Sequence, residues 1–194
     1  LQWTASYNGS TNDNDVGKGI AISNDGNIYC TGWTNFSGQG SNGWIGKYNT
    51  NGILQWTTTY NDSTNLDDAG LGISMDRDGN VYVTGHTNSD GMASDGWLRK
   101  YDTSGFVQWT TVYIRTETGD MSFNNVIVDT NSNVYVTGYE YDPSLSQDWN
   151  IILRKYVQPH FVHVWDGGGT DNLASNPQNW VGDIVPSNGD NVIF

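Results

Sequence analysis

Short alternations of apolar and polar residues recur along the chain and predict β-strands. Around Gly19–Ile22 the apolar residues with large side chains take every second position, and further on Ile28 and Cys30 share one face of an extended segment. A two-residue period is that of a strand with one face turned toward a core. Both stretches are therefore predicted strands.

Tight turns separate these strands from one another. The segment Ser23–Asn27 holds an Asp-Gly pair, which supplies the positive φ that a hairpin turn needs. A second turn at Asn49–Gly52 separates two more predicted strands, at 44–48 and 53–60. The pattern thus predicts a unit of four short strands.

This unit occurs three times, with a period of 53 residues. The tetrapeptides that begin at 1, 54 and 107 read LQWT, LQWT and VQWT, and the segments that begin at 26, 79 and 132 read GNIYCTG, GNVYVTG and SNVYVTG. Four strands in such a unit have the size of one β-propeller blade, somewhat above the roughly 40–50 residues of common propeller repeats. The prediction is an all-β fold with three four-stranded blades, at 1–53, 54–106 and 107–157.

The repeat resembles a known family. The pattern GIAISxDGNIYxTG, followed by GWIxKYxxxG, is similar to the bacterial beta-propeller repeat called SBBP, and the resemblance covers residues 1–157. It implies a propeller, here incomplete or open, in an exported or cell-surface protein, where such repeats often stand beside other β modules. The family has no shared catalytic residues, so the resemblance implies none in this chain.

A second resemblance concerns a tryptophan. Residues 48–56 are similar to the tryptophan-docking repeat of pyrroloquinoline-quinone enzymes, in which the ring locks neighbouring blades together. It implies a blade-docking role for Trp3, Trp56 and Trp109, and large apolar rings contribute buried area to any such contact. It also leaves open a fragment of a quinone-dependent propeller enzyme.

The repeat stops after Tyr156. Residues 158–163 are predicted to form a junction, in which Pro159 cannot donate to a sheet ladder. Residues 164–194 resemble the segment that opens β-solenoid regions in large autotransporter-like surface proteins, and we expect the truncated start of a second β module there. Propellers close with about four to eight blades. Three blades therefore leave open sheet edges. Further blades of a parent chain or other copies of this chain would cover these edges, or the three sheets would form an open array.

Composition narrows the choice of function. Gly accounts for 24 of 194 residues, and Glu occurs only at Glu117 and Glu140, which excludes an all-helical fold. The formal net charge of −13, with eight Lys and Arg, argues against nucleic-acid binding. The chain holds no run of 18 apolar residues, so we expect no membrane insertion within this segment. The single cysteine, Cys30, stands where the other copies have Val83 and Val136, and is predicted to be a small buried residue.

Two acidic patterns are candidates for metal binding. Asp76, Asp78 and Asn80 put hard oxygen ligands at alternate positions, as Ca²⁺ loops do. The same spacing also suits a hairpin turn, and both interpretations remain open. The second pattern is an acidic pair ahead of a predicted strand, which either gathers cations or carries solvated loop charge. Its two copies are Asp13 with Asp15, and Asp67 with Asp68.

Aromatic residues supply a candidate glycan site. Sugars stack on exposed rings, and the segment after the Thr-Gly strand carries rings that differ between the copies, as a partner-binding loop would. The candidates are Trp33, Phe36, Tyr139 and Tyr141. Packing of these rings onto the edge of a blade is the alternative interpretation.

The expected function is structural rather than catalytic, because the histidines, at 86, 160 and 163, lack the spacing and the company of a zinc site. The sequence favours a non-enzymatic structural or adhesive segment of a larger bacterial surface or matrix protein, located outside the cell. It would act as a rigid scaffold and interaction platform that assembles with copies of itself or with further blades. The alternative is a glycan-binding propeller module with loops ordered by Ca²⁺, and the second alternative is the quinone-dependent enzyme fragment.

Overall fold

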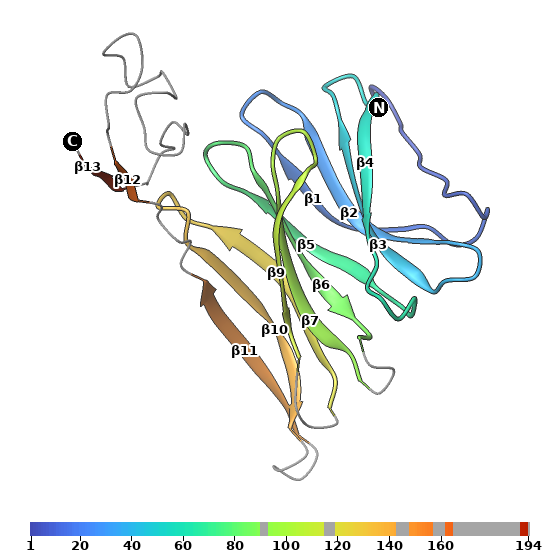
Figure 1. The fold of residues 1–194 in the computed structure, drawn as a ribbon. Coiled ribbons are helices and arrows are strands. Elements are labelled where there is room, and N and C mark those ends of the chain that lie inside the picture. Colours follow the sequence, from blue (N-terminus) through green and yellow to red (C-terminus); the bar gives the residue numbers. More distant parts are fainter. Residues whose placement is uncertain (90–92, 115–118, 143–147, 157–161, 165–190, 194) are drawn as a thin grey trace.

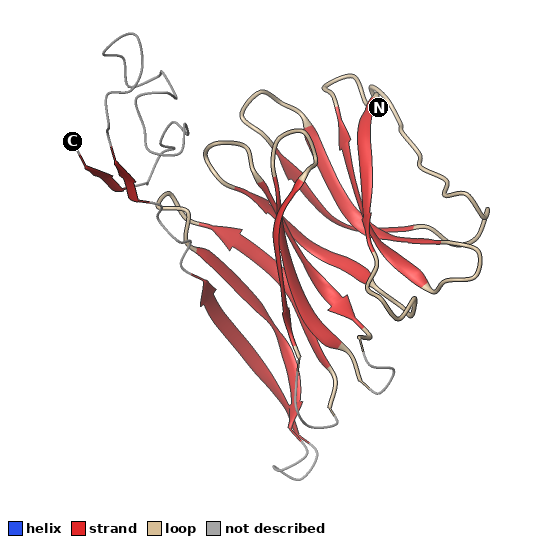
Figure 2. Ribbon diagram, in the orientation of Figure 1, coloured by secondary structure: helices blue, strands red, loops and turns tan. Residues whose placement is uncertain are grey.

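The fold is all-β, as the sequence predicted. The computed structural model describes residues 1–89, 93–114, 119–142, 148–156, 162–164 and 191–193, and over these residues it holds strands and loops but no helix (Figures 1 and 2). The strands in chain order are β1 (Val16–Ile22), β2 (Ile28–Asn35), β3 (Ser41–Tyr48), β4 (Leu54–Tyr60), β5 (Ala69–Met75), β6 (Val81–Thr87), β7 (Asp95–Tyr101), β8 (Val107–Tyr113), β9 (Met121–Val128), β10 (Val134–Asp142), β11 (Asp148–Tyr156), β12 (Val162–Val164) and β13 (Asn191–Ile193).

Three antiparallel sheets follow one another along the chain. Sheet I has the order β1-β2-β3-β4, sheet II the order β5-β6-β7-β8, and sheet III the order β11-β10-β9. The prediction of propeller-type blades is confirmed, and the four predicted strands are present in sheets I and II. Within the described residues sheet III has three strands, because β12 pairs in parallel with β13 and not with β11. Each four-stranded sheet ends on the strand with which the next sequence period begins, so the sheets span 16–60 and 69–113, not 1–53 and 54–106.

The sheets stack face to face, with sheet II in the middle (Figure 1). Strands β1, β5 and β9 begin their sheets, and β5 contacts both β1 and β9; we call these three the inner strands. We call the face that carries Ile20, Ile73 or Val126 the leading face of its sheet, and the face that carries Ile45, Leu98 or Leu153 the trailing face. The trailing face of each sheet packs on the leading face of the next.

Two core clusters fill these two seams. The first joins Tyr29 and Ile45 of sheet I to Ile73, Val81 and Val83 of sheet II. The second joins Tyr82 and Leu98 of sheet II to Val126, Val134 and Val136 of sheet III. Equivalent repeat positions thus form the same contacts twice, which leaves the leading face of sheet I and the trailing face of sheet III at the two ends.

The predicted hairpin chemistry is present between the first two strands of each sheet. Gly26 and Gly79 follow the aspartates of their Asp-Gly pairs and adopt φ of 84° and 83°. Ser132 takes the same place in sheet III with φ of 60°, a conformation that glycine adopts at lower cost. The turn type was therefore readable from two of the three copies.

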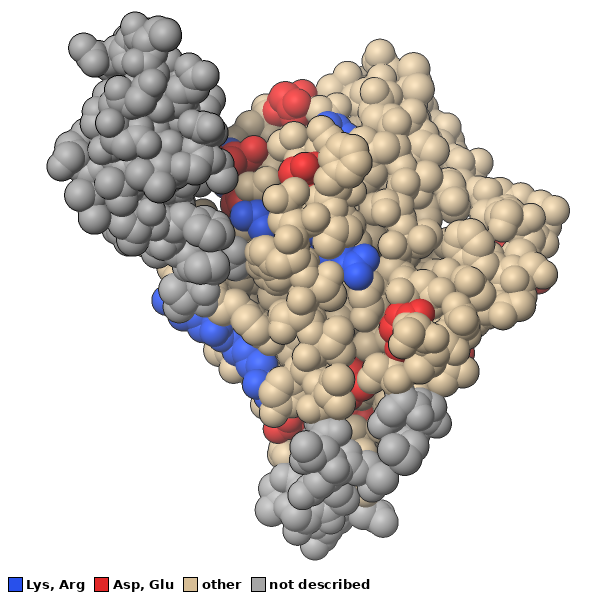
Figure 3. Space-filling view, in the orientation of Figure 1, with Lys and Arg blue, Asp and Glu red and all other residues tan. Residues whose placement is uncertain are grey.

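Charged side chains are sparse on the molecular surface. Figure 3 shows one face on which most atoms belong to uncharged residues, and the basic side chains form no broad patch there. None of the described residues belongs to a helix that is long and apolar enough to cross a bilayer.

Candidate functional site

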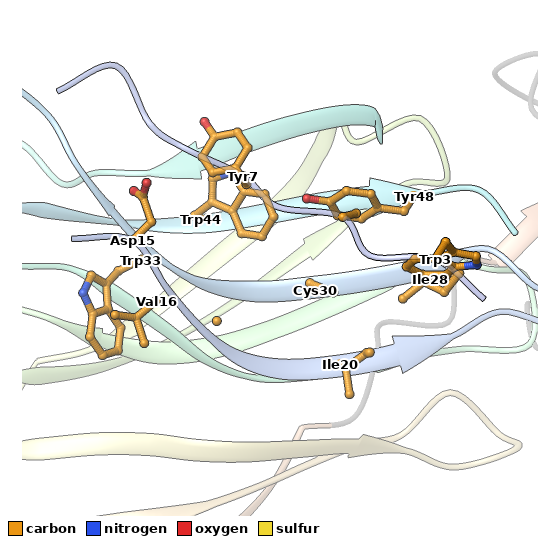
Figure 4. Close-up of a pocket in the computed structure, with 12 residues that line it drawn as sticks. Trp3, Tyr7, Asp15, Val16, Ile20, Ile28, Cys30, Trp33, Trp44 and Tyr48 are labelled. Carbon is orange, nitrogen blue, oxygen red and sulfur yellow. The ribbon is translucent and has the colours of Figure 1, made fainter. Parts of the chain in front are cut away.

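The leading face of sheet I carries an aromatic pocket of about 300 Å³ (Figure 4). Strands β1, β2 and β3 supply its floor, and the segment before β1 supplies one wall. Trp33 and Val16 stand at one end, Trp3 and Ile28 at the other, and Tyr7 lies against Trp44 between them. Asp15 is the one acidic residue in the lining. The pocket therefore combines several rings with a single carboxylate.

Residues 1–7 dock on sheet I although they form no strand of any sheet. The indole of Trp3 packs on Gly52, where a Cβ atom would lie 2.6 Å from the ring, and its Nε1 donates to the carbonyl of Thr50 at 3.2 Å. The rings of Tyr7 and Trp44 have centroids 4.6 Å apart. This segment is thus held by side chains and not by a sheet ladder.

The same contacts recur one sheet further along, where the equivalent segment is a strand. Trp56 of β4 packs on Gly105, where a Cβ atom would lie 3.0 Å from the ring, and the rings of Tyr60 and Trp97 stack at 4.4 Å. Trp109 of β8 packs against the core cluster between sheets II and III. The tryptophans predicted to dock blades therefore all lie at sheet-to-sheet positions, and Trp3 occupies that position without a sheet of its own.

Large apolar side chains are exposed at both ends of the stack. On the leading face, Ile20 is 73% exposed, whereas the equivalent Ile73 and Val126 are 8% and 2% exposed. On the trailing face, Leu153 is 75% exposed and the equivalent Leu98 is fully buried. Ile22, Ile127, Trp149 and Ile151 add to these exposed surfaces. The repeat thus places at each end a face of the kind that it buries in the middle.

The candidate glycan residues do not converge on one site. Trp33 lies in β2 and lines the aromatic pocket, with the Lys18 ammonium 4.9 Å above its ring, and Phe36 follows β2 in a loop. Tyr139 and Tyr141 lie in β10 of sheet III, where both contact the ring of Trp149. The prediction that these rings occupy a variable loop was wrong for Trp33, Tyr139 and Tyr141, because β2 and β10 continue beyond their Thr-Gly pairs by pairing with β3 and β11.

The candidate calcium residues lie in the hairpin between β5 and β6. Oδ1 of Asp76 accepts the N–H groups of Asp78 and Asn80 at 3.0 and 2.9 Å, and Oδ2 accepts Asn80 Nδ2 at 2.8 Å and the Tyr82 hydroxyl at 3.0 Å. Both oxygens of Asp76 are thus engaged by donors of the hairpin itself. Asp129 repeats the arrangement with Asn131, Asn133 and Tyr135, and its hydrogen bond from Asn133 lowers the pKa of the Asp129 carboxyl. These contacts account for the turn, and calcium binding stays a prediction.

Acidic residues of the second pattern accept hydrogen bonds from backbone N–H groups of loops and of a neighbouring sheet. Oδ1 of Asp67 accepts the N–H of Ser41 at 2.8 Å, which ties the segment before β5 to β3 of the preceding sheet, and Asp120 accepts the N–H of Ser94 in the same way. Asp15 accepts the N–H of Gly9. These contacts could not be predicted from the sequence, because the partners of Asp67 and Asp120 lie about half a period away.

Burial shifts the pKa of two side chains, Asp68 and His86. The Asp68 side chain is fully buried, and burial raises the pKa of its carboxyl to about 6, partly offset by the N–H of Asp62 that it accepts at 3.1 Å. Burial also lowers the pKa of His86. The backbone carbonyl of His86 accepts a hydrogen bond from Nε1 of Trp97. In the part of the chain that the structure describes, no three His, Cys, Asp or Glu side chains converge as a metal site.

Comparison with known proteins finds a repeat family similar to two segments of this chain. Residues 2–38 and 55–91 match the family SBBP, described as a beta-propeller repeat. These two segments are similar to the SBBP repeat. The two matched segments cover the first two strands of sheets I and II together with the docked tryptophans Trp3 and Trp56.

The solved structures similar to this chain include a fucose lectin from Kordia zhangzhouensis in complex with methyl-fucoside. The two are 12% identical with a TM-score of 0.43, and the match covers 73% of this chain and 96% of that chain. The search of curated proteins found no match.

Proposed function

We propose that the chain is a non-enzymatic interaction scaffold, a rigid segment of an extracellular bacterial surface or matrix protein that joins other β blades through its two end faces. One observation carries the proposal: repeat positions that are buried at both internal seams are exposed at the two ends. A face on which several large apolar side chains are exposed together marks an interaction site.

The internal seams support the rigidity that a scaffold needs. Stacked rings, the Asp67–Ser41 and Asp120–Ser94 bonds, and two core clusters hold each sheet to the next. The Arg99 guanidinium lies 4.3 Å above the ring of Tyr60 on the neighbouring sheet, and Arg154 lies 3.7 Å above Tyr113. Such contacts, repeated in register, fix the angle between the sheets.

The chemistry of the described residues supports a non-catalytic role. The buried carboxylates Asp68 and Asp76 accept hydrogen bonds from their own loops, and Cys30 is a half-buried thiol whose pKa burial raises. A raised pKa disfavours the reactive thiolate. The resemblance of residues 164–194 to segments of surface proteins supports the extracellular setting.

Sedimentation velocity tests the scaffold function. We expect the full chain to associate between about 1 and 200 µM, and expect Ile20→Lys or Leu153→Lys to weaken association by at least about tenfold, because each puts a charge into one end face. Gln55→Lys, which adds the same charge at an exposed position of β4, is the matched control. A wild-type chain that stays monomeric at the highest concentration would refute the proposal.

A second candidate function is glycan binding at the aromatic pocket, in a module with loops ordered by Ca²⁺. The observation that favours it is the combination of Trp33, Tyr48 and Asp15 around one pocket, since rings and carboxylates are the groups that hold a sugar. A glycan array with and without chelator tests it. Binding that is lost in Trp33→Ala and kept in Trp149→Ala would support this candidate, and an empty array would exclude it for the glycans tested.

A further inference from the structure

We propose that two copies of this chain dock head to tail, with the trailing face of sheet III of one copy on the leading face of sheet I of the other. In this arrangement residues 1–7 of the second copy supply the fourth strand that β11 lacks. The inference rests on the scaffold function and names the partner and the contact surfaces.

The first argument is an unpaired strand and an unpaired edge. Residues 1–7 carry the sequence of β4 and dock on sheet I as β4 docks on sheet II, yet they have no ladder partner. The outer edge of β11 likewise has no ladder partner among the described residues. An open sheet edge is a template for a strand from another chain.

The second argument is an orphan donor at that edge. In sheet II, Arg99 faces Thr110 across the β7–β8 ladder, and its Nε donates to Thr110 Oγ1 at 2.6 Å. The equivalent Arg154 has a buried Nε without a hydrogen-bond partner among the described residues. The repeat register pairs Arg154 with Thr4, whose hydroxyl would occupy the place of Thr110. The missing strand therefore brings the acceptor that this donor lacks.

The third argument is the shape of the two end faces. At the seam of sheets II and III, Gly96 leaves room for Phe123, whose ring carbons lie 3.1 to 3.2 Å from the place of a Cβ atom. The repeat equivalents at the open ends are Ile151 on sheet III and Gly17 on sheet I, where a Cβ atom would meet nothing within 4 Å. At the internal seam the glycine lies on the trailing face and the large residue on the leading face. At the open ends the large residue, Ile151, lies on the trailing face and the glycine, Gly17, on the leading face, so the two end faces are complementary to each other.

The fourth argument concerns closure. An interface between different surfaces of two copies produces a ring when the rotation closes, and propellers close with about four to eight blades. Among the described residues one copy has three sheets of three or four strands, so two copies supply six. We therefore expect a closed dimer of about 43 kDa, twice the 21.4 kDa of the chain.

One position departs from the internal seams. Gly19 and Gly72 let the inner strands approach, since a Cβ atom on Gly72 would lie 2.6 Å from the Cα of Asn125. Asn125 is the equivalent residue on the trailing face of sheet III. Its side chain holds the inner strands of the two copies further apart than those within a copy, so Asn125→Gly is expected to tighten the dimer.

Cross-linking between two full-length variants tests the register. Leu153 and Ala5 become opposite residues, as Leu98 and Thr111 are, and opposite residues in a ladder stand at a Cα distance that a disulfide spans. Both exposed positions tolerate cysteine without disturbing the core, and both variants also carry Cys30→Ala. We expect Ala5→Cys mixed with Leu153→Cys to form a disulfide dimer on oxidation. Asn24→Cys, at an exposed hairpin, replaces Ala5→Cys in the matched control and is expected to give none.

Sedimentation of three further variants tests the contacts. We expect Thr4→Val to weaken the dimer about tenfold and Thr4→Ser to leave it unchanged, because only the first removes the acceptor for Arg154. We expect Asn125→Gly to strengthen it. Association of the wild type that is insensitive to Thr4→Val, without the Ala5–Leu153 cross-link, would overturn the head-to-tail dimer and leave the scaffold function standing. A ladder of larger species would overturn closure by two copies, and a monomeric wild type would overturn both proposals.

Discussion

A single glycine decides whether two blades can pack at the seam of sheets II and III. Gly96 lies under the ring of Phe123, at a distance that leaves no room for a side chain. Gly17 also lies in a β-strand, but a Cβ atom on it would meet no atom within 4 Å. Identical residues at two strand positions therefore carry different steric demands.

We predict that Gly96→Val lowers the free energy of unfolding by about 1–3 kcal/mol, because the added methyl groups overpack the seam. Gly17→Val, the matched control, is expected to change it by less than about 0.5 kcal/mol at a concentration where the chain is monomeric. Urea unfolding at equilibrium measures both. Equal losses in the two variants would contradict the seam explanation.

Buried Asp68 gives the chain a pH dependence of defined sign. Burial raises the pKa of its carboxyl from 3.8 to about 6, so the stability that this group contributes is fully present below pH 3.8 and is lost as the pH rises through about 6. Ionised Asp68 thus opposes folding at neutral pH.

We predict that Asp68→Asn is more stable than the wild type by about 2–3 kcal/mol at pH 7.5 and that the advantage shrinks toward pH 4. The measurement is the difference in urea unfolding between the two proteins at each pH, in which the titration of all other carboxylates cancels. A variant that is less stable by the same amount at both pH values would show that the hydrogen bond from Asp62 outweighs the charge.

At the scale of the element, each hairpin between the first two strands depends on one polar side chain. Asp76 and Asp129 cap their turns with several accepted hydrogen bonds, whereas Ser23 takes this place in sheet I and donates to the carbonyl of Asn27. The turn is the same in all three, and its internal bonding is richest where an aspartate is present.

We predict that Asp76→Ala costs about 2–3 kcal/mol of unfolding free energy, because it leaves the buried hydroxyl of Tyr82 without an acceptor. Asp78→Ala, on the exposed tip of the same hairpin, is the control and is expected to cost under about 0.5 kcal/mol. Thermal unfolding with Ca²⁺ or chelator separates the turn from a calcium site. A calcium-dependent rise in Tm that Asp78→Ala abolishes would establish a calcium site, and an equal Tm with calcium and with chelator would show that the hairpin needs no ion.

At the scale of the whole molecule, the position of a sheet in the stack determines how much a given repeat position contributes to the free energy of unfolding. Leu98 in sheet II is enclosed by the second core cluster, and Leu153 in sheet III occupies the same repeat position at an open end. A repeat array gains its stability from such nearest-neighbour interfaces.

We predict that Leu98→Ala lowers the unfolding free energy by about 2–5 kcal/mol and that Leu153→Ala lowers it by under about 0.5 kcal/mol in the monomer. At concentrations where the proposed dimer forms, Leu153→Ala is expected to become destabilising as well. Urea unfolding at two protein concentrations measures the difference. A large cost of Leu153→Ala in dilute protein would show that the end face is already covered within one chain.

The sequence alone determined what is local and periodic: the all-β class, four strands per unit and the Asp-Gly hairpins. These follow from side-chain alternation and turn chemistry, which act over a few residues. Only the tertiary structure decided which copies are enclosed, that Trp33 lines a pocket while Tyr139 stands on the opposite end sheet, and that Asp67 binds Ser41. Burial depends on neighbours in space, so one repeat position is fully buried at Leu98 and 75% exposed at Leu153.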